Sequence, residues 1–173
     1  MPEFKLRFPE NEISAWAEKY QFGTDDRPEK VGTFAKENGF LDGRNLYDIC
    51  EWKSSRKAGS AKENLEASVK ELTRFSFSTA DEYSRIASLT LLKGVMWPTA
   101  SVILHFCVSE RYPILDVRAI WSLGEDKPSY YTFEYWQEYV RTCQDIADRN
   151  KISIRYLDKA LWQYSRENQD LIS

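Results

Sequence analysis

Hydrophobic residues recur at helical spacing along nearly the whole chain. Ile13, Trp16, Ala17 and Tyr20 stand at positions i, i+3, i+4 and i+7, which places them on one face of an amphipathic helix. Only residues 3–8 alternate between apolar and polar side chains, as a strand does. Wherever the helical spacing returns, it predicts a further helix: within residues 31–39, 46–50, 65–72, 79–94, 98–107, 116–124, 133–147 and 154–164. We therefore expect an all-α protein.

Residues at the helix ends support these assignments. Thr79 and Glu82 have the spacing of a capping box, in which two side chains bond to the free amides of a first helical turn. Pro98 suits the first turn of the next helix, because its ring fixes a helical φ and the missing N–H is not needed there. Asp116 is a favourable N-cap for the helix after that, which we expect to end at Gly124.

The composition excludes several classes of protein. Hydrophobic residues make up 42% of the 173 positions and charged residues 29%, as in an ordinary globular protein. No apolar run approaches the roughly 20 residues that span a bilayer, and the first residues lack the apolar stretch of a signal peptide. Cys50, Cys107 and Cys143 are odd in number and widely spaced, so we expect no disulfide framework, metal site or iron–sulfur cluster. These features favour a cytoplasmic protein.

Charge is unevenly distributed along the chain. The 24 basic and 27 acidic residues leave a formal net charge of −3, which argues against binding nucleic acid by overall charge. Residues 53–62 differ, because Lys53, Arg56, Lys57 and Lys62 occur there without an acidic residue. Such a segment is commonly a solvated loop, and the alternative is a surface that faces phosphates.

The connection formed by residues 92–96 is the first of two places with a possible chemical role. Two helices joined by so short a turn, with Gly94 in it, form a tight hairpin. The N-terminus of the second helix then offers free N–H groups and a positive dipole end, which suit a phosphate, and Lys93 can add its charge. An ordinary corner between helices, where Gly94 only permits a positive φ, is the alternative.

The second place is the segment from Tyr112 to Arg118. Pro113 favours an extended approach, and Asp116 stands where the next helix begins. Most aspartates in such positions do no more than cap a helix. A carboxylate there is nevertheless also able to take part in chemistry.

Together the two places resemble the helix-hairpin-helix-Gly/Pro/Asp superfamily of DNA glycosylases. The hairpin pattern L-x-G-V-x-x-x-T-A-x-x-I-L and the following Pro–Asp element fall within residues 79–124. The matching positions are Leu92, Gly94, Val95, Thr99, Ala100, Ile103, Leu104, Pro113 and Asp116. The resemblance implies a two-lobed helical bundle in which main-chain amides of the hairpin bind DNA phosphates, in some members with a monovalent cation. It also implies that Asp116 serves the chemistry at the sugar of an extruded nucleotide.

The chain departs from the family pattern in identifiable ways. Lys93 replaces a proline of the hairpin, and Met96 replaces its second glycine. Because Met disfavours positive φ, we expect altered phosphate contact at Met96. Members that also cleave the strand have a lysine where this chain has Pro98, so the resemblance implies a monofunctional glycosylase without lyase activity. The cysteine quartet of the iron–sulfur branches is missing.

The candidate site therefore has a catalytic and a DNA-binding part. Asp116 is the candidate catalytic residue, since a carboxylate stabilises the positive charge that forms on a sugar as its base leaves. The candidate DNA-binding residues are Lys53, Arg56, Lys57, Lys93, Gly94, Val95, Met96, Trp97, Thr99 and Arg118. Aromatic rings have to line a pocket for the extruded base, and the candidates are Trp97, Tyr112 and Trp121, with Tyr130 and Tyr131. Rings also fill helical cores, so both interpretations stay open. We read His105 as a surface or structural residue.

These expectations define a hypothesis about domains and partners. Residues 1–173 form one helical unit, and residues 1–45 with 130–173 are candidates for a second packed lobe. The expected partner is duplex DNA in base excision repair, and we expect a monomer in the cytoplasm or on the nucleoid, away from membranes. A DNA-binding protein without catalysis and a helical protein-interaction module are the alternatives. The sequence does not name the base.

Overall fold

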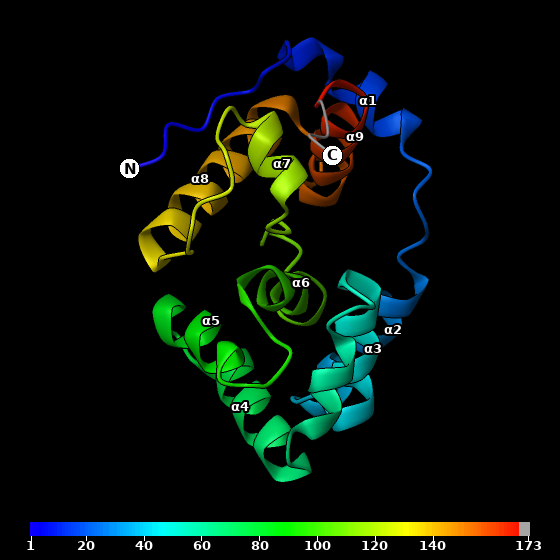
Figure 1. The fold of residues 1–173 in the computed structure, drawn as a ribbon, viewed down its shortest axis with the longest axis vertical. Helices are drawn as coiled ribbons and strands as arrows, with labels where there is room; N and C mark the ends of the chain where they lie inside the picture. Colours follow the sequence, from blue (N-terminus) through cyan, green and yellow to red (C-terminus); the bar gives the residue numbers. More distant parts are fainter. Residues whose placement is uncertain (170–173) are drawn as a thin grey trace. The chain divides into compact units, whose positions relative to one another are not determined.

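The computed structural model describes residues 1–169, and every regular element within them is a helix (Figure 1). The elements are η1 (Glu10–Glu12), α1 (Ile13–Lys19), α2 (Asp26–Asn38), α3 (Gly43–Lys53), η2 (Ala58–Glu63), α4 (Glu66–Ser78), α5 (Glu82–Thr90), α6 (Trp97–Cys107), α7 (Val117–Ser122), α8 (Phe133–Asn150) and α9 (Ile154–Asn168), where η marks a 3₁₀-helix. This confirms the all-α prediction. The chain divides into two compact units: unit 1 comprises residues 1–22 and the chain from residue 110, and unit 2 comprises residues 23–109.

Helix α6 lies in the core of unit 2, where it packs against α2, α3 and α5. The sequence predicted a single apolar stripe on this helix, but all of residues 99–107 are buried. His105 is among them, with its ring centroid 4.7 Å from that of Phe106, so the surface interpretation of His105 is wrong. Gly32 on α2 allows α2 and α6 to approach each other closely, since a Cβ there would lie 2.3 Å from the Phe106 carbonyl oxygen. Among residues 1–169, no helix has both the length and the apolar character needed to cross a membrane.

Unit 1 is built around α9, which contacts α1, α7 and α8. The strand-like pattern of residues 3–8 does not give a strand in the described chain, and this segment bends at residues 7–8. Its amides bond to the end of α7 instead: Lys5 N donates to Leu123 O at 2.7 Å and Arg7 N to Ser122 O at 2.9 Å. The alternation arises because apolar side chains such as Phe8 turn toward the core. A helix end, and not a second strand, satisfies these backbone groups.

The boundary between α4 and α5 corrects the predicted capping box. Thr79 follows the last residue of α4, and Asp81 caps α5 by accepting a hydrogen bond from Ser84 N at 2.8 Å. The Thr79 hydroxyl accepts from Asp81 N at 3.2 Å. Helix α5 also ends at Thr90, earlier than the predicted end near Gly94. The N-cap of α5 is therefore Asp81, two residues after the Thr79 that the capping box predicted.

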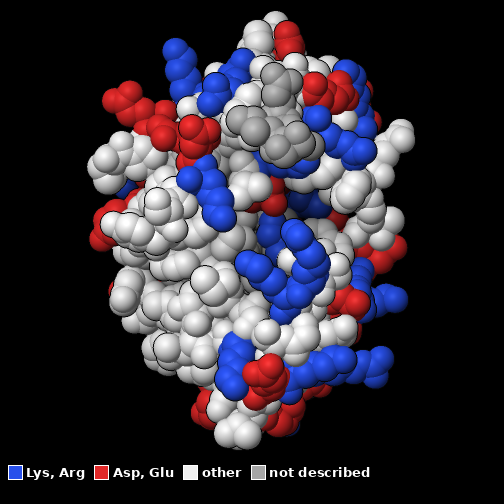
Figure 2. All heavy atoms as spheres, in the orientation of Figure 1, with Lys and Arg blue, Asp and Glu red and all other residues white. Residues whose placement is uncertain are grey.

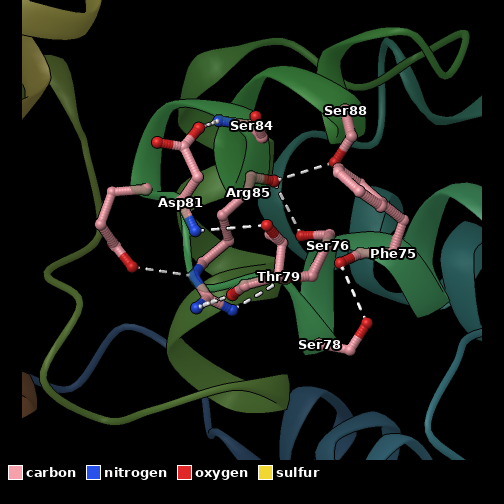
Figure 3. A network of polar contacts seen from close by, with 9 residues as sticks. Phe75, Ser76, Ser78, Thr79, Asp81, Ser84, Arg85 and Ser88 are labelled. Atoms are coloured by element: carbon pink, nitrogen blue, oxygen red, sulfur yellow. Dashed lines mark hydrogen bonds and ion pairs between the residues drawn. The ribbon is translucent and has the colours of Figure 1, made fainter.

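Arg85 explains why the chain turns at this point, and Figure 3 shows its contacts. Its guanidinium donates to the carbonyl of Ser76 at 2.8 Å and to that of Thr79, both at the C-terminal end of α4. In return, the Ser76 hydroxyl donates to the Arg85 carbonyl at 2.8 Å. Arg85 pairs with Glu82 at 3.0 Å, and its side chain is only 11% exposed. A positive charge thus satisfies orphan carbonyls where α4 ends.

Replacing Arg85 with Met is expected to lower the free energy of unfolding by about 2–3 kcal/mol, because two half-buried carbonyls lose a charged donor. Urea denaturation followed by circular dichroism measures this. Arg74→Met is the matched control, since the Arg74 side chain is 47% exposed, pairs with Glu71 on the same helix and stands over the ring of Phe40 at 4.9 Å on the surface. We expect that control to cost no more than about 0.5 kcal/mol. Equal stability of the two variants would contradict the structural role of Arg85.

Candidate nucleic-acid interface

The turn between α5 and α6 requires glycine for two independent reasons. Gly94 has φ +81°, a conformation that other residues rarely adopt. A Cβ at this position would also lie 2.9 Å from the Ala61 backbone nitrogen in η2. The turn is closed by Val95 N donating to Leu92 O at 3.2 Å, and the Cys50 thiol points its weak donor at Gly94 O, 3.9 Å away. Burial raises the pKa of Cys50 to about 12, so this thiol keeps its proton.

Asn64, the residue after η2, holds the turn from the other side. Its side-chain oxygen accepts from Lys93 N at 2.8 Å, and its side-chain nitrogen donates to Lys93 O at 2.9 Å. The two bonds satisfy both backbone polar groups of Lys93, as pairing with a neighbouring β-strand would. Asn64 is not recognisable from the sequence, because a single asparagine at the end of a polar segment gives no signal for a partner 29 residues away.

η2 brings the basic segment to the turn. Residues 58–62 of η2 belong to the lysine- and arginine-rich stretch that the sequence singled out separately, and Ala61 among them lies against Gly94. Lys62 stands over the ring of Tyr47 at 4.3 Å, while Lys57 and Arg56 are exposed. Lys93 pairs with Glu63 at 3.3 Å on the surface, which reduces the charge it offers. Figure 2 shows Lys and Arg side chains among Asp and Glu side chains on one face of the protein.

The predicted contact residues of the turn fall into two groups. Val95 and Thr99 are buried, and the Val95 amide is already used in closing the turn. Met96 is 61% exposed and has φ −97°, so it needs no positive φ and the expected strain is absent. In the part of the chain that the structure describes, the amides of Gly94, Met96 and Thr99 have no acceptor. These N–H groups at the start of α6 are what the turn offers to an anion.

Asp116 lies in unit 1, where it caps α7. Its carboxylate accepts from Arg118 N at 2.9 Å, and the side chain is half-buried. The capping role predicted from the sequence is confirmed. The segment before it is fixed by two buried groups: Ile114 N donates to the Asp158 carboxylate at 3.2 Å, and the Tyr139 hydroxyl donates to Ile114 O at 2.9 Å. Asp116 therefore stands at the end of a rigidly held loop.

Further contacts hold the start of this loop against α8. Arg111 makes a bidentate pair with Asp148, at 2.6 and 2.9 Å, and this pair holds the pKa of Asp148 below its usual value. Gln144 donates to the Arg111 carbonyl at 2.9 Å. Tyr112 stacks on Trp136, with ring centroids 5.9 Å apart. Tyr112 thus takes part in packing within unit 1.

The other aromatic candidates have different surroundings. Trp121 stacks on Tyr164 at 5.9 Å, and the guanidinium of Arg7 covers its ring at 4.5 Å. Tyr130 is 75% exposed, and Trp97 is half-buried in unit 2. Of these rings, Tyr130 lines an open hollow within unit 1, together with Glu125 and Tyr135.

Tyr131 lies close enough to Asp116 to be influenced by its charge. Burial, together with the negative charge of Asp116, raises the pKa of Tyr131 to about 12. Its hydroxyl therefore stays protonated at neutral pH. This hydroxyl is buried and has no hydrogen-bond partner among residues 1–169. A buried donor without a partner, within range of the charge of a carboxylate, is a pattern that active sites use.

The structure groups the candidate residues by unit. The turn and the basic segment belong to unit 2, whereas Asp116, Arg118, Tyr112 and Trp121 belong to unit 1. Among the described residues, no three His, Cys, Asp or Glu side chains gather as a metal site.

No protein-family model matches the chain, and the searches of curated proteins and of solved structures returned no match.

Proposed function

We propose that the chain is a DNA-binding protein of the DNA glycosylase type. It binds duplex DNA through a helix-hairpin-helix formed by α5 and α6 in one of two lobes, and it hydrolyses the N-glycosidic bond of an extruded base with Asp116. The observation that carries the proposal is the packing of η2, part of the basic segment, against the Gly94 turn. Two features that the sequence presents separately thus belong to one surface.

The binding step follows from the groups on this surface. Amides without an acceptor at the start of α6 suit a phosphate oxygen, and the dipole of the helix favours negative charge there. Lys57, Lys62 and Arg56 are exposed and supply positive charge on the basic segment, of which Ala61 lies against the Gly94 turn. Such contacts are made to the DNA backbone, so they bind without reading sequence. The local charge outweighs the formal net charge of −3 at this surface.

The chemical step uses the carboxylate of Asp116. As the bond between C1′ and the base nitrogen breaks, its electron pair leaves with the base and positive charge develops on the sugar. The carboxylate stabilises that charge and takes a proton from the water whose oxygen bonds to C1′. The departing base takes up a proton and an abasic site remains.

The experiment that tests the proposal is a screen of duplexes with different damaged or modified bases, scored for abasic sites. We expect release of at least one base, and binding whose affinity falls steeply with salt. Binding without release of any base supports the non-catalytic alternative. Absence of DNA binding at low salt favours a protein-interaction module and overturns the proposal.

Pro98 leads to a prediction about the product. Its ring nitrogen is part of the peptide bond, so it cannot form a Schiff base with the sugar as an amine does. We expect the DNA strand to remain intact after base release until heat or alkali cleaves it. Gel electrophoresis before and after alkali measures this. A protein–DNA adduct trapped by borohydride would contradict the prediction and would direct attention to Lys93.

A further inference from the structure

Residues 3–7 of unit 1 are bonded to the end of α7 through every second amide. The three bonds run from Glu3 N to the Glu125 carboxylate at 2.9 Å, from Lys5 N to Leu123 O at 2.7 Å and from Arg7 N to Ser122 O at 2.9 Å. Side chains follow the same period, because Glu3, Lys5 and Arg7 are exposed whereas Phe4 and Leu6 are half-buried. Alternation with a period of two is the geometry of a β-strand, although this segment has no partner strand in the described chain.

The two amides in between have a different environment. Phe4 N and Leu6 N have no acceptor among residues 1–169. Because the flanking amides face α7, the amides of Phe4 and Leu6 face away from it. We call the main chain of Phe4 and Leu6 on this side the open edge. Such an edge offers its polar groups to the backbone of another extended segment.

A hollow of about 470 Å³ lies next to the open edge, between this segment and α8. Phe4 and Leu6 line it from one side, and Ile146 of α8 lines it from the other. Its volume lies within the range of clefts that hold ligands. An apolar side chain that enters the hollow is removed from water against these three residues, which favours binding.

The charged groups along the hollow are paired to different degrees. Arg149 donates from Nε to the Glu10 carboxylate at 2.9 Å, and hydrogen bonds from Arg149 and Asn150 lower the pKa of Glu10. Glu10 and Asp145 in turn raise the pKa of Arg149, so these three charges are balanced mainly against one another. Lys5 is exposed and has no carboxylate within ion-pair distance among residues 1–169. Its charge is therefore available to a ligand.

Three kinds of partner compete for such a surface. In a second copy of this chain, antiparallel pairing about Leu6 would place Lys5 opposite Arg7, and like charges in that position are destabilising. A nucleic acid would bring its phosphates toward the carboxylates of Asp145 and Glu10. An extended peptide is able to pair with the open edge, fill the apolar hollow and place an acidic side chain opposite Lys5. The observations therefore favour a peptide.

We propose that the open edge and the hollow bind an extended peptide segment of a partner protein. The backbone of the peptide pairs with Leu6 as an added strand, its apolar side chains enter the hollow, and an acidic side chain faces Lys5. Because successive side chains of a strand alternate between two faces, apolar and acidic residues alternate in the peptide. This contact belongs to unit 1 and does not depend on the proposed DNA binding.

Fluorescence anisotropy with two labelled peptides tests the charge preference. One peptide alternates valine with glutamate and the other alternates valine with lysine. The wild-type protein should bind the glutamate peptide about fivefold or more tightly than the lysine peptide. Lys5→Glu should reverse this preference. Lys127→Glu is the matched control, since Lys127 is an exposed residue of unit 1 that does not line the hollow, and it should keep the wild-type preference.

A substitution at Leu6 tests the backbone pairing. Leu6→Pro removes the amide of the open edge while the bonds of Lys5 and Arg7 to α7 remain, so it should weaken binding of the glutamate peptide about fivefold or more. Leu6→Val keeps both the amide and an apolar side chain, and it should bind nearly as the wild type does. Circular dichroism checks that each variant is folded.

Several results would overturn the proposal. Neither peptide binding to the wild type, or equal affinities of folded Leu6→Pro and Leu6→Val, excludes an added strand at the open edge. A wild-type dimer that Leu6→Pro dissociates, measured by analytical ultracentrifugation, identifies a second copy as the occupant. Loss of affinity for duplex DNA in Leu6→Pro but not in Leu6→Val assigns the open edge to nucleic acid. Peptide binding with unchanged DNA affinity supports the proposal, whatever the outcome of the duplex screen.

Discussion

Asp116→Asn is expected to lower the rate of base release by about 10²–10³ while leaving the melting temperature nearly unchanged. The side-chain oxygen of Asn can still accept the hydrogen bond that Arg118 N donates, so the cap of α7 is kept. What the variant loses is the negative charge that stabilises a cationic sugar. Single-turnover kinetics on the substrate found in the duplex screen measure the rate, and thermal unfolding measures the stability.

Asp81→Asn is the matched control for this prediction. Asp81 caps α5 through the same kind of bond, 2.8 Å from Ser84 N, but lies in unit 2. Its replacement should change neither the rate nor the stability appreciably. Asp116→Ala should lose both the charge and the cap, at about 1 kcal/mol of stability. If Asp116→Asn folds normally and releases base at nearly the wild-type rate, Asp116 is a cap and the catalytic assignment is wrong.

Gly94→Val is expected to weaken DNA binding at least about tenfold, or ~1.4 kcal/mol, while most helical content remains. The substitution forces a β-branched residue into φ +81° and pushes a Cβ toward the Ala61 nitrogen, so η2 has to move away from the turn. This displaces the basic segment from the amides of α6. Anisotropy titration at matched salt measures the affinity, and circular dichroism measures the helical content.

Gly39→Val separates backbone strain from the loss of the surface. Gly39 also has a positive φ, +78°, and belongs to unit 2, but a Cβ there meets nothing within 4 Å. We expect this control to lower stability by about 1–3 kcal/mol and to leave DNA affinity unchanged. Wild-type affinity in folded Gly94→Val would show that the turn is only a corner between helices.

Local signals determined the helices themselves. The spacing of residues such as Ile13 and Trp16 predicted the amphipathic elements, and Asp116 and Gly124 predicted the limits of α7. These predictions depend on residues within a turn or two of one another, where backbone hydrogen bonding and capping decide the outcome. The same reasoning failed at Thr79, where the carbonyl accepts from Arg85 six residues further along the chain and the helix begins only after Asp81.

The candidate site was predictable residue by residue but not as an assembly. Gly94, with its positive φ, and Asp116, with its capping bond, were identified from the sequence. The pairing of Asn64 with Lys93 was not, and the rings of Tyr112 and Trp121 could not be assigned to pocket or core. An aromatic residue has the same signature in a sequence whether it lines a cavity or fills a core.

The sequence by itself thus determined the helical class, several helix ends and the local geometry of Gly94 and Asp116. Only the tertiary structure decided that η2 packs on the Gly94 turn and that the end of α7 binds every second amide of residues 3–7. The physical reason is the range of the interactions. Helix formation and capping are settled between neighbours in the chain, whereas the burial of apolar surface chooses which distant segments meet.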